Sequence, residues 1–131
     1  WDKVLNFQGE TGPYIQYTYV RTKSVLEKAE YLPKIEEVKT EMLTDECSQD
    51  ILKLIYNFQD ILVQVTEKNE PSILARYLID LAKAYSSFYN ENKIIVEDKE
   101  VQNARVYLTY ATSEVLKQGA KLLGIEMPEK M

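Results

Sequence analysis

Hydrophobic positions along most of this chain recur at intervals of three and four residues, the spacing of an amphipathic α-helix. The first such segment predicts a helix from Pro13 to about Glu30. Gly12 is suited to the N-cap position and Pro13 to the first helical position, where a missing N–H costs nothing. Pro33 is expected to end this helix, because the residue before a proline disfavours helical geometry.

The middle of the chain predicts two further helical stretches separated by polar segments. Residues 34–45 are charged and low in aromatic residues, so we expect a solvated connector, with one or two helical turns as the alternative. Asp45 or Ser48 is then expected to cap a helix that continues to about Thr66. The Asn57–Asp60 step could divide it into two shorter helices, and periodicity does not decide between these alternatives.

The two longest stripes of apolar residues lie in the second half of the chain. Residues 71–89, with Pro71 at the first helical position, carry the broadest stripe and predict the central core helix, whose aromatic side chains are expected to pack inside. Asp98 is expected to cap the last helix, which has Gly124 just beyond its end. The expected core side of this helix carries Val101, Ala104, Leu108, Ala111, Val115, Leu116 and Leu122.

These segments predict an all-α fold, an antiparallel bundle of four to five helices in a single domain over residues 1–131. Only four glycines and four prolines interrupt the chain, which favours long helices. No apolar run approaches the length of a membrane-spanning helix.

The helix expected from Pro13 carries two different faces. With Tyr14 at 0° and about 100° per residue, a polar and aromatic stripe falls between about 280° and 360°. It consists of Tyr14, Tyr17, Arg21, Ser24 and Lys28. A second arc between about 20° and 140° is suited to burial. It consists of Ile15, Thr18, Tyr19, Thr22, Val25, Leu26 and Ala29.

The stripe admits two interpretations. Periodicity alone favours packing against a neighbouring helix. The alternative is a platform on which unstacked bases lie against aromatic faces while arginine and lysine meet phosphates.

Composition limits the chemistry that the chain could perform. It has no histidine, one cysteine (Cys47) and no phosphate-binding loop, so no catalytic constellation or metal motif is found. A single cysteine fits a reducing compartment. The net charge of −5 argues against nucleic acid binding by the whole surface. Between Tyr14 and Lys28, however, there are three basic residues and one acidic residue, so a local basic patch is still available.

The residues around the first helix resemble a known family signature. The run GETGPYIQY at residues 9–17, followed by Arg21, is similar to the pattern G-[DE]-T-G-P-Y-x-Q-Y-A-H-x-R that opens the C-terminal domain of arginyl-tRNA synthetases. Residues 71–90 resemble the middle helix of that domain, and residues 115–131 resemble its closing segment. The resemblance therefore covers the whole chain and implies the helical anticodon-binding domain called the DALR domain.

The resemblance implies a set of site residues. It assigns Tyr14, Tyr17, Arg21 and Met131 to anticodon binding. It also suggests anticodon-loop contacts by Asn6, Gln8, Thr11, Ser24 and Lys28. The sequence departs from the pattern at Thr18 and Tyr19, which stand where the family has Ala-His. Both lie on the buried arc, so we expect packing to be affected more than recognition. The letters D-A-L-R do not occur, and the nearest string is Ile-Leu-Ala-Arg at residues 73–76.

The resemblance also implies partners and a parent enzyme. The partners would be arginine tRNA and a catalytic domain of the same chain, with no DNA or membrane partner, and the protein is expected to be a cytoplasmic monomer. The parent would be an arginine–tRNA ligase that uses ATP with magnesium in protein biosynthesis. The present sequence lacks a starting methionine and is expected to be its non-catalytic C-terminal fragment, with no cofactor of its own. The alternative is a free-standing helical module that binds a protein or RNA without a catalytic domain.

Overall fold

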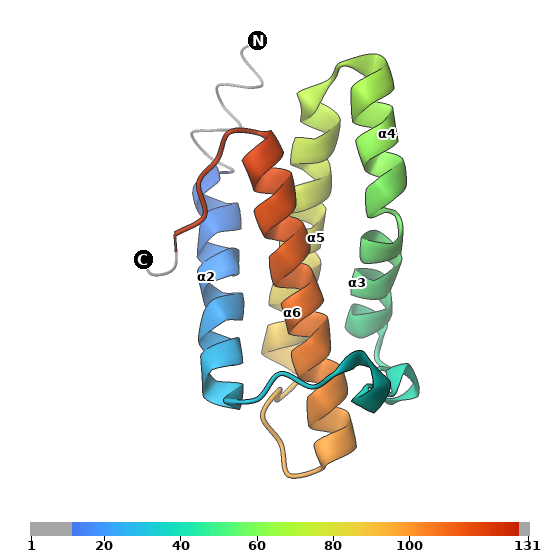
Figure 1. Cartoon of the computed structure of the whole chain (residues 1–131), viewed down its shortest axis with the longest axis vertical. Helices are drawn as coiled ribbons and strands as arrows, with labels where there is room; N and C mark the ends of the chain where they lie inside the picture. The colour runs from blue at the N-terminus through green and yellow to red at the C-terminus, as the bar shows by residue number, and fades with distance from the viewer. Residues whose placement is uncertain (1–11, 129–131) are drawn as a thin grey trace.

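The structure, a computed structural model, describes residues 12–128, and helices joined by loops and turns make up this part of the chain, with no strand among these residues. The fold is all-α, as the sequence predicts. Figure 1 shows the elements as an elongated bundle. Its α-helices are α2 (Gly12–Ala29), α3 (Glu46–Tyr56), α4 (Phe58–Lys68), α5 (Pro71–Glu91) and α6 (Lys99–Leu122).

The helices run up and down the long axis of the bundle (Figure 1). Helices α3 and α4 follow one another along one side, α5 returns, and α6 runs back beside it. Helix α2 packs against both α5 and α6. It runs antiparallel to α6 and in the same direction as α5. This arrangement places the first and last helices of residues 12–128 side by side.

The core is formed chiefly by α5, which contacts every other α-helix of the described bundle. Its predicted apolar stripe is confirmed, with Leu78, Leu81 and Tyr85 inaccessible to solvent. One prediction for α6 is wrong, because Leu122 is 65% exposed. Six residues separate it from buried Leu116, a rotation of about 240° on a helix, so it points away from the buried side. Gly124 follows with φ +76°, the left-handed turn that glycine accommodates easily.

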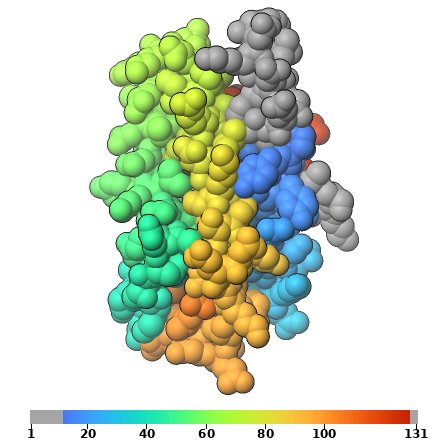
Figure 2. Space-filling model, turned by 180° about the vertical axis from the view of Figure 1, so that it is seen from behind, coloured from blue at the N-terminus to red at the C-terminus, as the bar shows by residue number. Residues whose placement is uncertain are grey.

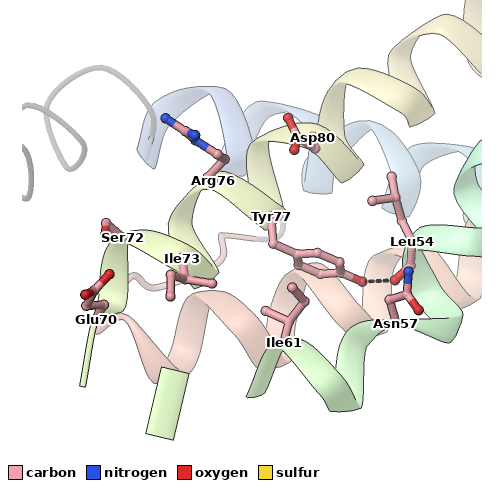
Figure 3. A pocket seen from close by; sticks show the side chains of 9 residues that line it. All are labelled: Leu54, Asn57, Ile61, Glu70, Ser72, Ile73, Arg76, Tyr77 and Asp80. Atoms are coloured by element: carbon pink, nitrogen blue, oxygen red, sulfur yellow. Dashed lines mark hydrogen bonds between the residues drawn. The ribbon is translucent and has the colours of Figure 1, made fainter. Parts of the chain in front are cut away.

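The alternative that the sequence left open for α3 and α4 is resolved as two helices. The break falls at Asn57, whose N–H bonds to carbonyls of the preceding turn. Tyr77 of α5 donates a hydrogen bond from its Oη to the Leu54 carbonyl at 2.5 Å, which supplies a partner where the helix is interrupted. Burial of the Tyr77 hydroxyl raises its pKa. Figure 3 shows this bond at one end of a groove of about 460 Å³ between the break and α5.

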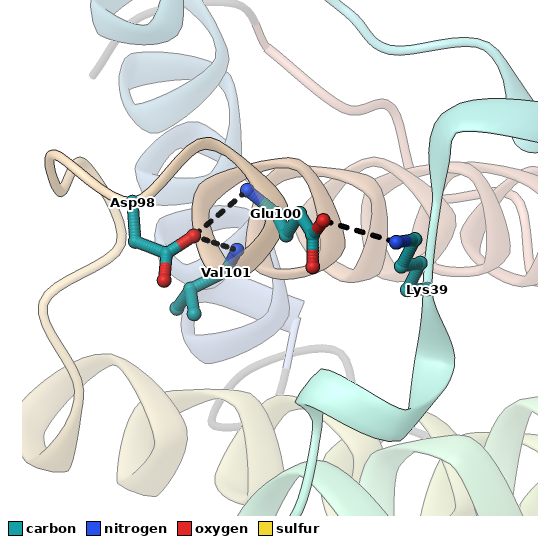
Figure 4. Close-up of polar contacts among 4 residues, drawn as sticks. All are labelled: Lys39, Asp98, Glu100 and Val101. Carbon is teal, nitrogen blue, oxygen red and sulfur yellow. Dashed lines mark hydrogen bonds and ion pairs between the residues drawn. The ribbon is translucent and has the colours of Figure 1, made fainter.

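The connector between α2 and α3 is more ordered than a solvated linker. It contains two short 3₁₀ turns, η2 (Ile35–Glu37) and η3 (Thr40–Met42), and its Leu43 side chain is buried. The Lys39 Nζ lies 3.0 Å from Glu100 Oε1, which ties the connector to the first turn of α6 (Figure 4). The alternative of one or two helical turns is therefore closer to the structure than a solvated linker.

Both predicted aspartate caps are present. Asp98 accepts hydrogen bonds from the backbone N–H groups of Glu100 and Val101 at the start of α6 (Figure 4). Asp45 accepts from the backbone N–H and the hydroxyl of Ser48 at the start of α3, and from the side-chain amide of Asn92 at 3.1 Å. Because Asn92 directly follows α5, the Asp45 carboxylate joins the beginning of one helix to the end of another.

None of the helices in residues 12–128 combines the length and the apolar character needed to cross a membrane.

The close approach of α5 and α6 at Gly119 gives a first testable prediction. A Cβ atom at this position would lie 2.6 Å from Cδ2 of Leu78, which has no solvent-exposed surface and little room to move. We expect Gly119→Ala to lower the free energy of unfolding by about 1–2 kcal/mol, because the overpacking cost exceeds the gain in helix propensity. Chemical denaturation measures this. Gln118→Ala, at an exposed position, should leave the free energy of unfolding unchanged. In a Leu78→Ala background, Gly119→Ala should no longer cause the clash.

The Asp45 cap predicts a pH-dependent loss of stability. Partial burial of this carboxyl would raise its pKa, but hydrogen bonds from Ser48 and Asn92 outweigh burial and lower the pKa below 3.8. The folded state therefore gains stability from the charged form, which is lost as pH falls through that lowered pKa. Asp45→Ala should cost about 1–2 kcal/mol at pH 7. Denaturation curves of both proteins between about pH 5 and pH 2 should show the difference shrinking. A difference that stays constant would contradict this assignment.

Candidate functional site

The outward side of α2 carries the stripe that the sequence singled out, which we call the tyrosine–arginine face (Tyr14, Tyr17, Arg21, Ser24 and Lys28). The opposite arc is buried, as predicted, with Ile15 and Thr22 inaccessible to solvent. Tyr17 is 54% exposed, Ser24 and Lys28 are exposed, and Tyr14 and Arg21 are half-buried. Tyr14 and Arg21 therefore contact α5, as the packing interpretation expects, whereas Tyr17, Ser24 and Lys28 form a solvent-facing surface of the described bundle.

Arg21 occupies the centre of this face and lies between two tyrosine rings. Its guanidinium carbon is 5.1 Å from the ring centroid of Tyr17 and 4.6 Å from that of Tyr89 on α5. Its Nη2 also donates to the Tyr17 hydroxyl at 3.1 Å. These cation–π contacts hold the positive charge in place while leaving one tyrosine ring largely open to solvent. The arrangement presents a flat aromatic surface and a fixed cation together.

Helix α5 forms one border of the tyrosine–arginine face, and Figure 2 shows α2 and α5 side by side on this side of the molecule. The Tyr14 hydroxyl lies 3.3 Å from Ser86 Oγ of α5. Beneath Tyr89, the buried ring of Tyr85 lies 6.5 Å away, centroid to centroid, and its hydroxyl pairs with Thr109 Oγ1 of α6 at 3.1 Å. Burial raises the pKa of Tyr85, so this supporting hydroxyl stays neutral.

Tyr89 lies at the edge of the core rather than inside it. The stripe of α5 predicted a core position for it, but it is only half-buried and faces Arg21. Its position at the edge of a long apolar stripe was the available signal. Periodicity alone does not show which neighbouring helix a stripe-edge residue meets, so the pairing of Tyr89 with Arg21 required the structure.

The basic residues of α2 do not all point the same way. Lys23, which contributed to the local basic balance, lies with its Nζ 5.5 Å from the ring centroid of Tyr19, beside the buried arc. Arg21 and Lys28 are the cations on the tyrosine–arginine face itself. Thr18 and Tyr19, where the sequence departs from the family pattern, are both buried as expected.

Several predicted site residues fall outside residues 12–128, namely Asn6, Gln8, Thr11 and Met131. The described end of the chain nevertheless returns to α2 (Figure 1). The Ile125 N–H bonds to the Ala120 carbonyl at 2.8 Å, and Gln16 Nε2 donates to the Glu126 carbonyl at 2.8 Å. Residues 125–128 are therefore seated beside the helix that bears the tyrosine–arginine face.

Cys47 lies away from this face, at the start of α3. Its Sγ donates to Glu91 Oε2 at 3.0 Å, and this bond, together with some burial and nearby carboxylates, raises its pKa to about 11. A helix start can lower the pKa of a thiol, but the acidic neighbours of Cys47 have the opposite effect. The thiol therefore remains protonated near neutral pH and is a poor nucleophile.

Comparison with known proteins matches the chain to one family. The family model of the DALR anticodon binding domain matches residues 15–131. The chain is 50% identical over 132 residues to an arginine–tRNA ligase of Halothermothrix orenii and 42% identical over 131 residues to that of Clostridioides difficile. Each match covers the entire chain but 23% of the relative, so the chain spans about a quarter of their length.

A solved structure agrees with these sequence matches. The Thermus thermophilus arginyl-tRNA synthetase superposes with a TM-score of 0.81 at 25% identity, over 91% of this chain and 21% of that one. The helical bundle, the seated C-terminal segment and the exposed α2 signature are thus found together with a family match over most of the chain. The chain belongs to the DALR anticodon binding domain family.

Proposed function

We propose that this chain binds the anticodon stem-loop of arginine tRNA through the tyrosine–arginine face of α2. The observation that carries the proposal is Arg21, held between Tyr17 and Tyr89 on an otherwise solvent-facing surface. Unpaired anticodon bases offer flat rings, and the loop backbone offers phosphates. An exposed tyrosine with a fixed guanidinium beside it is suited to both.

The remaining predicted site residues extend this proposal. Ser24 and Lys28 continue the face along α2 and would meet the loop backbone. Asn6, Gln8 and Thr11 before the helix and Met131 at the other end of the sequence are proposed to contact the loop as well. We propose further that Tyr89 shares the site as the second ring against Arg21.

The whole protein is proposed to be an arginine–tRNA ligase. The two relatives described above carry that name, and this chain corresponds to about a quarter of each. The sequence contains no phosphate-binding loop. ATP with magnesium would accordingly be bound by a catalytic domain outside these residues. The helical domain described here would contribute recognition of the tRNA. A cytoplasmic, monomeric protein is the corresponding expectation.

The proposal predicts the effect of two substitutions on RNA affinity. Tyr17→Ala should weaken binding of an arginine-tRNA anticodon stem-loop about fivefold to a hundredfold, because one stacked base is worth about 1–3 kcal/mol. Arg21→Ala should weaken binding by a similar factor, since charge-assisted hydrogen bonds are worth about 1.5–3 kcal/mol. It should also lessen the salt dependence of the affinity. Fluorescence anisotropy with labelled RNA measures the affinities of both variants and the salt dependence of binding.

Matched substitutions elsewhere on the bundle serve as controls. Tyr56 on α3 is 86% exposed, and Lys53 is an exposed cation on the same helix. Neither belongs to the tyrosine–arginine face, so Tyr56→Ala and Lys53→Ala should leave the affinity within about twofold of the original, a difference below about 0.5 kcal/mol. If the α2 variants bind the stem-loop as tightly as these controls do, the assigned face is wrong.

A further inference from the structure

The C-terminal segment forms a second border of the tyrosine–arginine face, opposite α5. On the α2 helical wheel, Tyr14 and Arg21 lie nearest α5, whereas Gln16 lies about 100° from Tyr17 on the other side. Gln16 is the α2 residue that bonds to the returning chain at Glu126. The exposed ridge of α2 is therefore bounded by a rigid helix on one side and by an extended segment on the other.

Within the described part of the chain, this extended segment is held by two hydrogen bonds and by the side chains of Ile125 and Met127. After Gly124, the Ile125 N–H bonds to α6, the Ile125 side chain reaches the neighbourhood of Gly12, and Met127 is half-buried against the core. The Gln16 amide supplies a side-chain hydrogen bond that joins residues 110 positions apart in the sequence. Chain ends stay ordered only where such contacts tie them down, so this bond helps to fix the segment.

We propose that Gln16 is a positioning residue for RNA binding. By donating to the Glu126 carbonyl, it holds residues 125–128 along α2 and so sets the second border of the site. Gln16 does not itself contact the RNA in this account. The inference rests on the proposed function of the tyrosine–arginine face and adds to it the side chain that ties the C-terminal segment to the signature helix.

Gln16→Leu is the direct test, because leucine keeps the helix propensity and approximate size of glutamine but cannot donate a hydrogen bond. Loss of one neutral hydrogen bond should weaken binding of the arginine-tRNA anticodon stem-loop about threefold to tenfold. The matched control is Gln64→Leu, at an exposed glutamine of α4, a helix that borders neither side of the face. It should leave the affinity unchanged.

A second readout separates positioning from a general loss of stability. The chain has three methionines, so methyl-¹³C labelling gives a small set of signals. Gln16→Leu should change the chemical shift of the Met127 methyl group and narrow its linewidth toward that of a mobile methyl group. The Met42 signal, in the η3 turn, should not change. If Met127 is unaffected while RNA affinity falls, Gln16 does not act by holding this segment, and the inference is overturned.

A truncated chain ending at Gly124 completes the test. If Gln16 acts through the segment, truncation should lower RNA affinity at least as much as Gln16→Leu, and adding Gln16→Leu to it should have no further effect. An equal loss in both backgrounds would contradict the inference and indicate direct RNA contact. Failure of the proposed function itself would look different, since Tyr17→Ala would then leave RNA binding by the intact chain unchanged.

Discussion

The rotational setting of α2 about its own axis is the constraint on which the rest of the site depends. Thr18 and Thr22 are buried, yet their hydroxyls donate to the carbonyls of Tyr14 and Tyr19 within the same helix. This side of α2 therefore packs against α5 and α6 without leaving polar groups unpaired. Ile15 adds apolar contact on the same arc. Because this arc is fixed against the bundle, the opposite side of the helix must face solvent.

That setting brings together side chains that a single helix could not arrange alone. Arg21 is positioned between Tyr17 of its own helix and Tyr89 of α5, which in turn rests on a buried tyrosine. The negative net charge of the chain weighs less against the proposed RNA binding at such a place, because salt screens distant surface charges while the fixed cation and open ring act locally. The proposed role of Gln16 follows from the same rotational setting of α2, because this setting directs the Gln16 side-chain amide toward the C-terminal segment at Glu126.

Much of this organisation could be predicted from the sequence, where periodicity and capping chemistry act locally. The two faces of α2, the core stripe of α5 and the caps at Asp45 and Asp98 are of this kind. The break at Asn57 was undecided because apolar spacing continues across it, and the Tyr77 hydroxyl that compensates for it comes from another helix. The meeting of Tyr89 with Arg21 and of Gln16 with Glu126 depends on tertiary packing, which periodicity does not encode.

A backbone amide chemical-shift map of the chain, titrated with an arginine-tRNA anticodon stem-loop, tests whether the tyrosine–arginine face binds RNA. If it does, the largest changes in residues 12–128 will fall on the outward side of α2 around Tyr17 and Arg21, on α5 near Tyr89, and on residues 125–128. Amides of α3 and α4 should change little. Changes concentrated on α3 and α4, or no changes at RNA concentrations that saturate binding, would contradict it.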